Sequence, residues 1–343
     1  MYKRLHSLIA MILLLSIIPV ASHAVTPFYE GKAIHIVVGF AAGGGYDIYA
    51  RLIARHLGKY LPGNPSIIVE NMPGAGSMIA AKYIFSRTKP DGLTIATFTS
   101  QLILGQILGR EGFDIDMRKF EWIGVPVRDH VVCGLTKASG ITSLEQWMVS
   151  KTPVKIGANP PGDVTSDVPK IVKAVLNLPI QVVHGYKGTA EIRLAADAGE
   201  IAGGFWQWES MKVMWGTQIN AGQVVVVLQV TPEAHPDLPN VPVATRFAKT
   251  EEGRQLIKAG VYDPASITRL YALPPGTPKD LVQILRKAFQ ETTKDPVLLE
   301  EAKNSQLDIN PVTGEEIEGV LKGLFNLSPT TVSKLKEILF PGK

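Results

Sequence analysis

The sequence is poor in cysteine, because Cys133 is the only one among its 343 residues. A single cysteine excludes an intramolecular disulfide and any zinc site built from several thiolates. Charge of one sign is also scarce, since 35 basic residues face 31 acidic ones and leave a formal net charge of +4. This small excess does not support a nucleic-acid-binding surface, so no nucleic acid partner is expected. The seven histidines show no HExxH or other paired spacing, and no metal site is expected.

Long apolar runs are missing after the first two dozen residues. Within those first residues, Lys3 and Arg4 precede an apolar stretch over 8–20. A small-x-small cleavage motif follows and ends at Ala24. This order is typical of a secretory signal peptide, here expected over 1–24 and cleaved after its last residue. The alternative is an uncleaved membrane anchor, but the stretch is shorter than the roughly 20 residues that span a bilayer. We therefore expect an exported mature protein.

The mature chain contains a repeated pattern of strand, loop and helix. Strands are expected over 33–40, 66–70, 93–98, 154–158, 180–183 and 224–230. Helices are expected over 165–177, 189–198 and 279–293, and extended stretches over 122–136 and 267–272. Such alternation predicts an α/β protein. Two similar units joined by two extended crossings predict a two-lobed clam-shell, with lobe 1 over 25–126 and 265–343 and lobe 2 over 127–264.

Two glycine-rich loops each lie between an expected strand and an expected helix. They read GGGYD over 43–47 and NMPGAGS over 71–77. Ligands of open parallel sheets sit outside the carboxyl ends of the strands, and helix starts there favour a carboxylate or phosphate. Neither loop has the dinucleotide fingerprint or a nucleotide P-loop, and each alone could be a bare turn. Their combination favours one shared anion site.

Several longer segments resemble the substrate-binding receptors of tripartite tricarboxylate transporters, also called Bug receptors. The resemblance covers about residues 28 to 300 and is carried by IHIVVGFAAGGGYDIYARLIARHL, VENMPGAGS, KPDGLTI, VVHGYKGTAEIRLAADAGEI and LPPGTPKDLVQILRKAF. It implies a type II-like periplasmic-binding-protein fold, a periplasmic location and no cofactor. It also implies a carboxylated small-molecule ligand and membrane permease subunits as partners, although some members report to a sensor partner instead. We expect a monomer.

The resemblance implies a carboxylate clamp on lobe 1, made by Ala42, Gly43, Gly44, Gly45, Gly74, Ala75, Gly76, Ser77, Thr99 and Ser100. Asp47 matches the family too, but a carboxylate repels an anion. We therefore expect it to serve the helix start, unless the ligand carries an amine. On lobe 2 the expected ligand contacts are Gly162, Thr165 and Tyr186. The chain departs from the family over 158–165, where two prolines and Asp163 replace a small Ser- and Gly-rich turn.

A second departure places Trp206 and Trp208 where relatives often have an acidic residue. Trp206 is expected to line the cleft and to suit a larger or planar solute, with packing in the core or at the hinge as the alternative. No G-x-S-x-G elbow and no convergent acid–base set is present, so the protein is not expected to be an enzyme. The alternative is an exported lyase or dehydratase with Asp163 or Glu209 as base and Lys187 as a possible partner.

Overall fold

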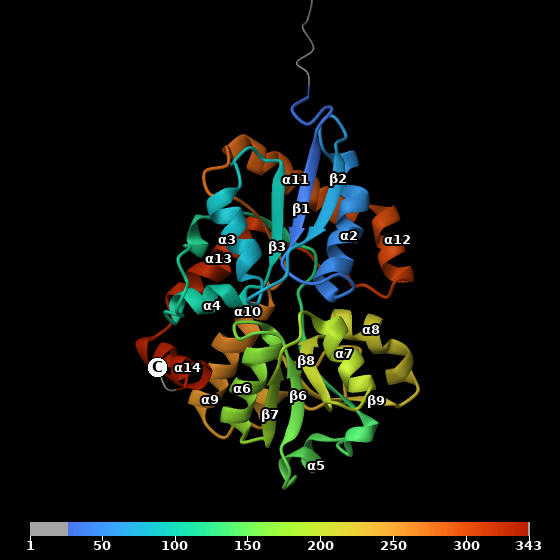
Figure 1. Cartoon of the computed structure of the whole chain (residues 1–343), viewed down its shortest axis with the longest axis vertical. Helices are drawn as coiled ribbons and strands as arrows, with labels where there is room; N and C mark the ends of the chain where they lie inside the picture. The colour runs from blue at the N-terminus through green and yellow to red at the C-terminus, as the bar shows by residue number, and fades with distance from the viewer. Residues whose placement is uncertain (1–26, 342–343) are drawn as a thin grey trace, which may run out of the picture.

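The computed structural model describes residues 27–341, so the expected signal peptide lies outside the described residues. Within this range the chain forms two α/β halves, one above the other in Figure 1, and each half has its own sheet. The half with the six-stranded sheet is called lobe 1 below, and the half with the five-stranded sheet is called lobe 2. Between residues 27 and 341, no helix has both the length and the apolar character needed to cross a membrane.

Lobe 1 is built on a mixed sheet with the strand order β11-β4-β10-β3-β1-β2. Its parallel strands are β1 (Ala33–Val38), β2 (Ser66–Asn71) and β3 (Thr94–Phe98). Antiparallel pairing adds β10 (Leu270–Leu273), β4 (Glu121–Val125) and β11 (Val312–Thr313). The helices around it are α2 (Gly45–Leu57), α3 (Met78–Arg87), α4 (Gln101–Ile107), α11 (Lys279–Lys294), α12 (Pro296–Asn304) and α13 (Gly314–Phe325). The apolar run of β1 suits a strand that is covered by helices on both faces.

Lobe 2 repeats this plan with the strand order β7-β6-β8-β5-β9. Its strands are β5 (Val131–Thr136), β6 (Val154–Ala158), β7 (Ile180–His184), β8 (Gly203–Gln207) and β9 (Val224–Val230). Strand β6 runs parallel to β7 and β8, whereas β5 runs antiparallel to β8 and β9. The helices are α5 (Leu144–Met148), α6 (Val164–Leu176), α7 (Thr189–Asp197), α8 (Trp208–Asn220) and α9 (Glu251–Ile257). The short α10 (Asp263–Ala265) lies between the lobes, where it contacts α4 and α13 of lobe 1 (Figure 1). The predicted α/β clam-shell class is therefore confirmed.

Aromatic side chains fill the core of lobe 1. Phe98, Phe120 and Trp122 lie with their ring centroids 5.3–6.1 Å apart. Burial of apolar surface stabilises the fold by roughly 25 cal/mol per Å², and aromatic rings of this size contribute a large share of that area. Cys133 of β5 is free and buried in lobe 2, where it packs as a small apolar residue.

An ion pair joins the two segments through which the chain passes between the lobes. Asp129 lies on the first crossing, between β4 and β5, and Arg269 lies on the second, directly before β10. Arg269 Nε is 2.9 Å from Asp129 Oδ2, and both side chains are at most 1% exposed. The guanidinium also lies 4.5 Å from the ring centroid of Tyr49. The two crossings are thus held together by a fully buried ion pair.

The C-terminal helix α14 (Pro329–Leu339) departs from the predicted division of the chain, which placed all of 265–343 in lobe 1. It packs against α6 and α9, beside lobe 2 in Figure 1, while α13 directly before it packs against β4 and α4 of lobe 1. Leu335 is buried, and its Cδ2 lies 2.9 Å from where a Cβ on Gly260 would be. The apolar face of α14 is therefore satisfied by lobe 2.

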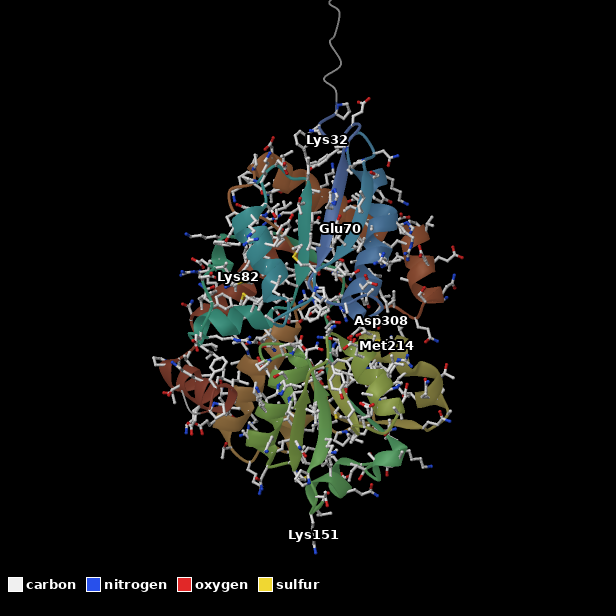
Figure 2. The ribbon with its side chains drawn as sticks, viewed as in Figure 1. Lys32, Glu70, Lys82, Lys151, Met214 and Asp308 are labelled. Carbon is white, nitrogen blue, oxygen red and sulfur yellow. The ribbon has the colours of Figure 1, made fainter. Side chains whose placement is uncertain are left out.

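The lobes touch each other along their shared boundary. Asp308 of lobe 1 and Met214 of lobe 2 both lie at this level in Figure 2. Lys212 of α8 reaches across with its Nζ 2.5 Å from Asp308 Oδ2. Arg110, which follows α4, donates a hydrogen bond to the carbonyl of Pro161 in lobe 2. These contacts define a closed arrangement of the two lobes.

Candidate solute-binding site

Four helices begin at the boundary between the lobes, and their first residues line one small space, called the inner cavity below. The residues that line it are the N-cap residues Gly44, Asp163, Gly188 and Gln207, then Gly45 and Tyr46 of α2, Val164 and Thr165 of α6, Thr189 of α7 and Ser210 of α8, together with Phe40 and Asn159. The starts of α2, α7 and α8 have no side-chain cap. The first N–H groups and the helix dipoles of α2 and α7 therefore favour a negatively charged ligand group, whereas the Trp208 N–H at the start of α8 already donates to the His130 carbonyl at 2.7 Å.

The inner cavity measures only about 10 Å³, roughly the space of one water molecule. A wider outer cavity of about 370 Å³ adjoins it, because Phe40 and Asn159 line both. The remaining lining of the outer cavity is Pro73, Gly74, Gly76, Ser77, Pro160, Gly185, Tyr186 and Lys187. A volume of this order is typical of small-molecule sites. The two cavities together run from the glycine loops of lobe 1 to the strand ends of lobe 2.

Half of the ten residues expected in the lobe 1 clamp lie at these cavities. Gly44 and Gly45 line the inner cavity, and Gly74, Gly76 and Ser77 line the outer one. The expected residues Ala42, Gly43 and Ala75 are exposed and line neither. The two glycine loops therefore line adjoining cavities rather than one common cavity, and only part of each loop takes part.

Thr99 and Ser100, also expected in the clamp, are fully buried behind it. Ser100 Oγ donates a 2.6 Å hydrogen bond to the carbonyl of Pro264, and Thr99 Oγ1 accepts one from the Gln101 N–H. The Thr99 N–H donates to Ser77 Oγ at 3.2 Å. In this closed arrangement both residues hold the loops of lobe 1 in place, and neither lines a cavity.

Of the ligand contacts expected on lobe 2, Thr165 lines the inner cavity and Tyr186 lines the outer one. Thr165 Oγ1 accepts the N–H of Asn159 at 2.8 Å. Gly162 lines neither cavity, but it lies against the second glycine loop of lobe 1. A Cβ added to Gly76 would be 3.2 Å from the Gly162 carbonyl oxygen. These loops form part of the contact that closes the site.

Trp206 does not lie where the sequence-based hypothesis placed it. Its side chain is fully buried in lobe 2 and stacks on Trp215, with ring centroids 4.9 Å apart. Gln207, one position further at the end of β8, lines the inner cavity instead. Trp208 is buried as well, and its Nε1 donates a 2.9 Å hydrogen bond to Asp237 Oδ2. Both tryptophans therefore belong to the packing of lobe 2.

The two acidic residues noted in the sequence have different surroundings. Asp47 lies in the first turn of α2, where its carboxylate accepts hydrogen bonds from the Gly43 N–H and from Arg51 Nε. Burial alone would raise the pKa of Asp47, but the hydrogen bonds from Arg51, Gly43 and Asn71 outweigh it and lower the pKa. The expected role of Asp47 at the helix start is confirmed.

Asp163 is 3% exposed and caps α6, with its Oδ1 accepting the Thr165 N–H at 3.0 Å. Burial raises the pKa of this carboxyl above its ordinary value, although the hydrogen bonds from Thr165 act in the opposite direction. The nearby Asp167 raises the pKa further, because it carries a charge of the same sign. The sequence marked Asp163 as a departure from the family, and the structure places it in the wall of the inner cavity.

Asp163→Asn is expected to raise the melting temperature of the solute-free protein at pH 7 by a few degrees. The folded state binds the Asp163 proton more tightly than the unfolded chain does, so the ionised form costs stability above the raised pKa. The cost disappears as the pH falls through that pKa, and the gain of the variant should shrink accordingly. Asp47→Asn is the matched control. The pKa of Asp47 is lowered in the folded protein, so its ionised form stabilises the fold, and the variant should have a lower melting temperature at pH 7. Thermal unfolding between pH 4 and pH 8 measures the melting temperatures of both variants. A lower melting temperature for Asp163→Asn at pH 7 would contradict the prediction.

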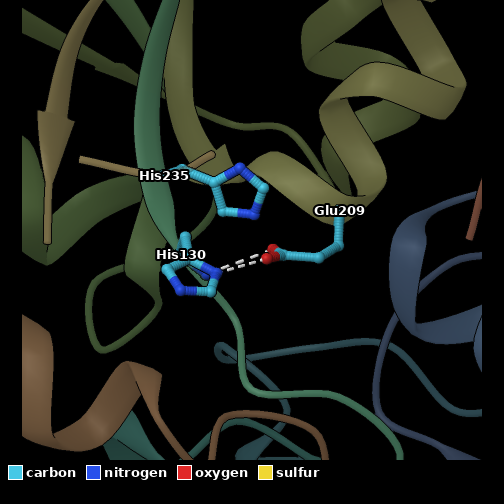
Figure 3. Close-up of side chains that lie close together, drawn as sticks. All are labelled: His130, Glu209 and His235. Carbon is cyan, nitrogen blue, oxygen red and sulfur yellow. Dashed lines mark hydrogen bonds and ion pairs between the residues drawn. The ribbon is translucent and has the colours of Figure 1, made fainter. Parts of the chain in front are cut away.

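A second polar cluster lies beside the first crossing, outside both cavities. His130, Glu209 and His235 offer ligand atoms that lie within 4.8 Å of one another, and Figure 3 shows both rings facing the carboxylate. The Glu209 carboxylate accepts hydrogen bonds from the His130 Nδ1 and backbone N–H at 2.5 and 3.1 Å. Glu209 is thus engaged in fixing the crossing and does not line either cavity, which removes the alternative that it is a catalytic base there.

A two-lobed α/β chain with helix starts converging on a space between the lobes has the architecture of a solute-binding protein. A sequence profile of the tripartite tricarboxylate transporter family receptor (TctC) matches residues 49–319, and the chain belongs to this family. The family is one of binding proteins and not of enzymes. This outcome confirms the resemblance found in the sequence.

Solved structures show the same fold. The chain is 21% identical to the periplasmic binding protein BugD, with a TM-score of 0.70 and coverage of 90% of this chain and 98% of that one. MatC from Rhodopseudomonas palustris with bound malate is 19% identical, with a TM-score of 0.69 and coverage of 90% and 98%. An R. palustris protein with adipate is also 19% identical, with a TM-score of 0.70 and coverage of 89% and 97%.

A curated relative agrees with this assignment. A UPF0065 protein of Bordetella bronchiseptica is 24% identical over 301 residues, which cover 85% of this chain and 81% of the relative. The similarity therefore extends over most of both proteins.

Proposed function

We propose that this protein is a periplasmic receptor that captures a small carboxylate between its lobes and delivers it to the membrane permease of a tripartite tricarboxylate-type transporter. One observation carries the proposal: the starts of four helices line the inner cavity, and three of them have no side-chain cap. Backbone N–H groups at such positions bind an anion without any lysine or arginine. Family membership and the malate and adipate bound by two similar structures support a carboxylate as that anion.

In this proposal the solute enters while the lobes are apart and docks its carboxylate at the start of α2, where Gly44 and Gly45 expose their backbone. Lobe 2 then closes on the solute and brings Thr165 and Tyr186 to its other side. The solute stabilises the closed form because it contacts both lobes only there. The permease recognises this closed form.

Export through cleavage after Ala24 completes the proposal. It is supported by the charged start, the apolar stretch and the small residues before the cleavage point. The similarity to periplasmic binding proteins is consistent with the same compartment.

A thermal-shift screen of the mature protein with aliphatic and aromatic mono- and dicarboxylates is expected to give at least one clear stabilisation. A ligand at about 100 times its Kd stabilises the folded state by roughly 2.7 kcal/mol, which is easily measured. Amides of the same acids serve as controls, since they keep the shape and lose the charge. If no carboxylate shifts the melting temperature, or if the amides shift it equally, the proposed function is wrong.

A further inference from the structure

The carboxylate of Asp163 uses only one of its two oxygens. Its Oδ1 accepts hydrogen bonds from Asn159 Nδ2 at 3.0 Å, from the Thr165 N–H at 3.0 Å and from Thr165 Oγ1 at 2.5 Å. Oδ2 receives none from any residue in the described part of the chain, although Asp163 lines the inner cavity. The hydrogen bonds that cap α6 therefore occupy Oδ1 and leave Oδ2 free to accept a hydrogen bond.

The neighbouring Asn159 leaves a second acceptor without a partner. This residue is 2% exposed and lines both cavities, and its Oδ1 is buried with no hydrogen bond among the described residues. The bond from Nδ2 to Asp163 fixes the orientation of the amide, so the oxygen cannot exchange places with the nitrogen. A buried acceptor without a donor costs stability, and a bound group that donates to it would remove that cost.

The charge of Asp163 is not balanced in the way that the charge of Asp47 is. Asp47 pairs with Arg51 at 2.9 Å, whereas Asp163 has no ion pair among the described residues and feels the like charge of Asp167. Burial raises the pKa of Asp163, as expected for a carboxyl that lacks a cation. A cationic group that meets Asp163 when the lobes close on a solute would supply what the protein does not.

We infer that the solute carries a protonated amine as well as its carboxylate, and that Asp163 Oδ2 and Asn159 Oδ1 accept hydrogen bonds from this amine. The inference rests on the proposed function. Lobe 1 then offers N–H donors to the carboxylate, and lobe 2 offers acceptors to the ammonium group. A hydroxyl would satisfy one acceptor but would leave the charge of Asp163 unbalanced, whereas an ammonium group has three protons to donate and a compensating charge. The solute class is therefore that of amino acids and similar zwitterions.

The test compares acids that differ only in the amine. Calorimetric titration of the mature protein uses aspartate against succinate, glutamate against glutarate, leucine against 4-methylpentanoate, and phenylalanine against 3-phenylpropanoate. In the pair that binds, the amino member is expected to bind at least tenfold more tightly. Asp163→Asn, which keeps the shape and the α6 cap, is expected to reduce this preference at least tenfold.

Asp167→Asn is the matched control, because Asp167 is a buried carboxylate on the same helix whose Oδ1 accepts the Gly162 N–H and which lines neither cavity. Its variant should keep the amine preference. Asn159→Ala, which leaves the α6 cap in place, should lose part of it, and thermal unfolding verifies that each variant is folded.

Each outcome has one meaning. If an acid without the amine binds as tightly as its amino partner, or if Asp163→Asn leaves the preference unchanged, the inference is overturned while the proposed function stands. If no member of any pair binds and the carboxylate screen is also negative, the proposed function fails and the inference fails with it.

Discussion

Arg269→Met is expected to lower the free energy of unfolding by roughly 3–5 kcal/mol, the usual effect of breaking a buried ion pair by removing one partner. Arg269 and Asp129 are almost completely buried, and they hold the two crossings together. Without the guanidinium, Asp129 must either keep an uncompensated buried charge beside Glu209 or take up a proton, because burial and the Glu209 carboxylate both raise its pKa and Arg269 is the group that lowers it. Urea unfolding of the solute-free protein measures the loss.

The double variant Asp129→Leu/Arg269→Met separates the loss of the pair from the penalty of the unpaired charge. Replacement of both partners by apolar residues is often neutral or stabilising, so the double variant should recover most of the loss. Arg118→Met is a surface control. Arg118 pairs with Asp116, both side chains are partly exposed, and exposed ion pairs contribute little to the free energy of unfolding. If Arg269→Met unfolds at the same urea concentration as the unmodified protein, the ion pair does not stabilise the crossings.

Gly44→Val is expected to weaken solute binding at least 100-fold, which corresponds to roughly 2.7 kcal/mol. Gly44 has φ −86° and ψ 171°, an extended conformation that valine adopts readily. A Cβ at this position would lie 3.3 Å from Thr189 Oγ1 of lobe 2, and the two methyl groups of valine need more space than that. The variant therefore folds but cannot close on a solute docked at the start of α2.

Calorimetric titration with the carboxylate identified by the screen measures the effect. Ala42→Val, two residues earlier in the same loop, should bind normally because Ala42 is exposed and lines neither cavity. Gly76→Val is a poorer probe, because Gly76 has φ +60° and valine would strain the loop itself. Normal affinity in Gly44→Val would show that the first glycine loop is not part of the site.

The sequence predicted the secondary structure around the site closely, because the relevant patterns are local. The strand over 154–158 agrees with β6, and the helices expected from 165 and from 189 begin within one residue of the starts of α6 and α7. A buried parallel strand followed by glycine and a helix start can be recognised within about twenty residues. The two glycine loops were therefore placed correctly at the edge of one sheet.

Side-chain direction and long-range pairing could not be predicted in the same way. Phe205 and Trp206 are neighbours on β8 and point to opposite faces, with Phe205 near Trp147 and Trp206 on Trp215. Without the sheet, the sequence does not show which face meets the cleft, and in fact neither ring does. The partners Asp129 and Arg269 are 140 residues apart, so no local pattern connects them.

Asp163 shows a third limit. Its position after a strand marked it as unusual, but its partners decide its chemistry. Only the structure shows that Oδ1 is fully used and Oδ2 is not. The difference from Asp47, which is paired with Arg51, is likewise invisible in a sequence where both residues simply precede or begin a helix.

The position of α14 gives the molecule a third link between its halves, in addition to the two crossings. The chain leaves α13 on lobe 1 and, after residues 326–328, enters α14 on lobe 2. Two links beside each other allow one lobe to swivel on the other, but a third link at a distance opposes that rotation. The 326–328 connection therefore has to accommodate any movement of one lobe relative to the other, and a longer connection would leave that movement less restricted.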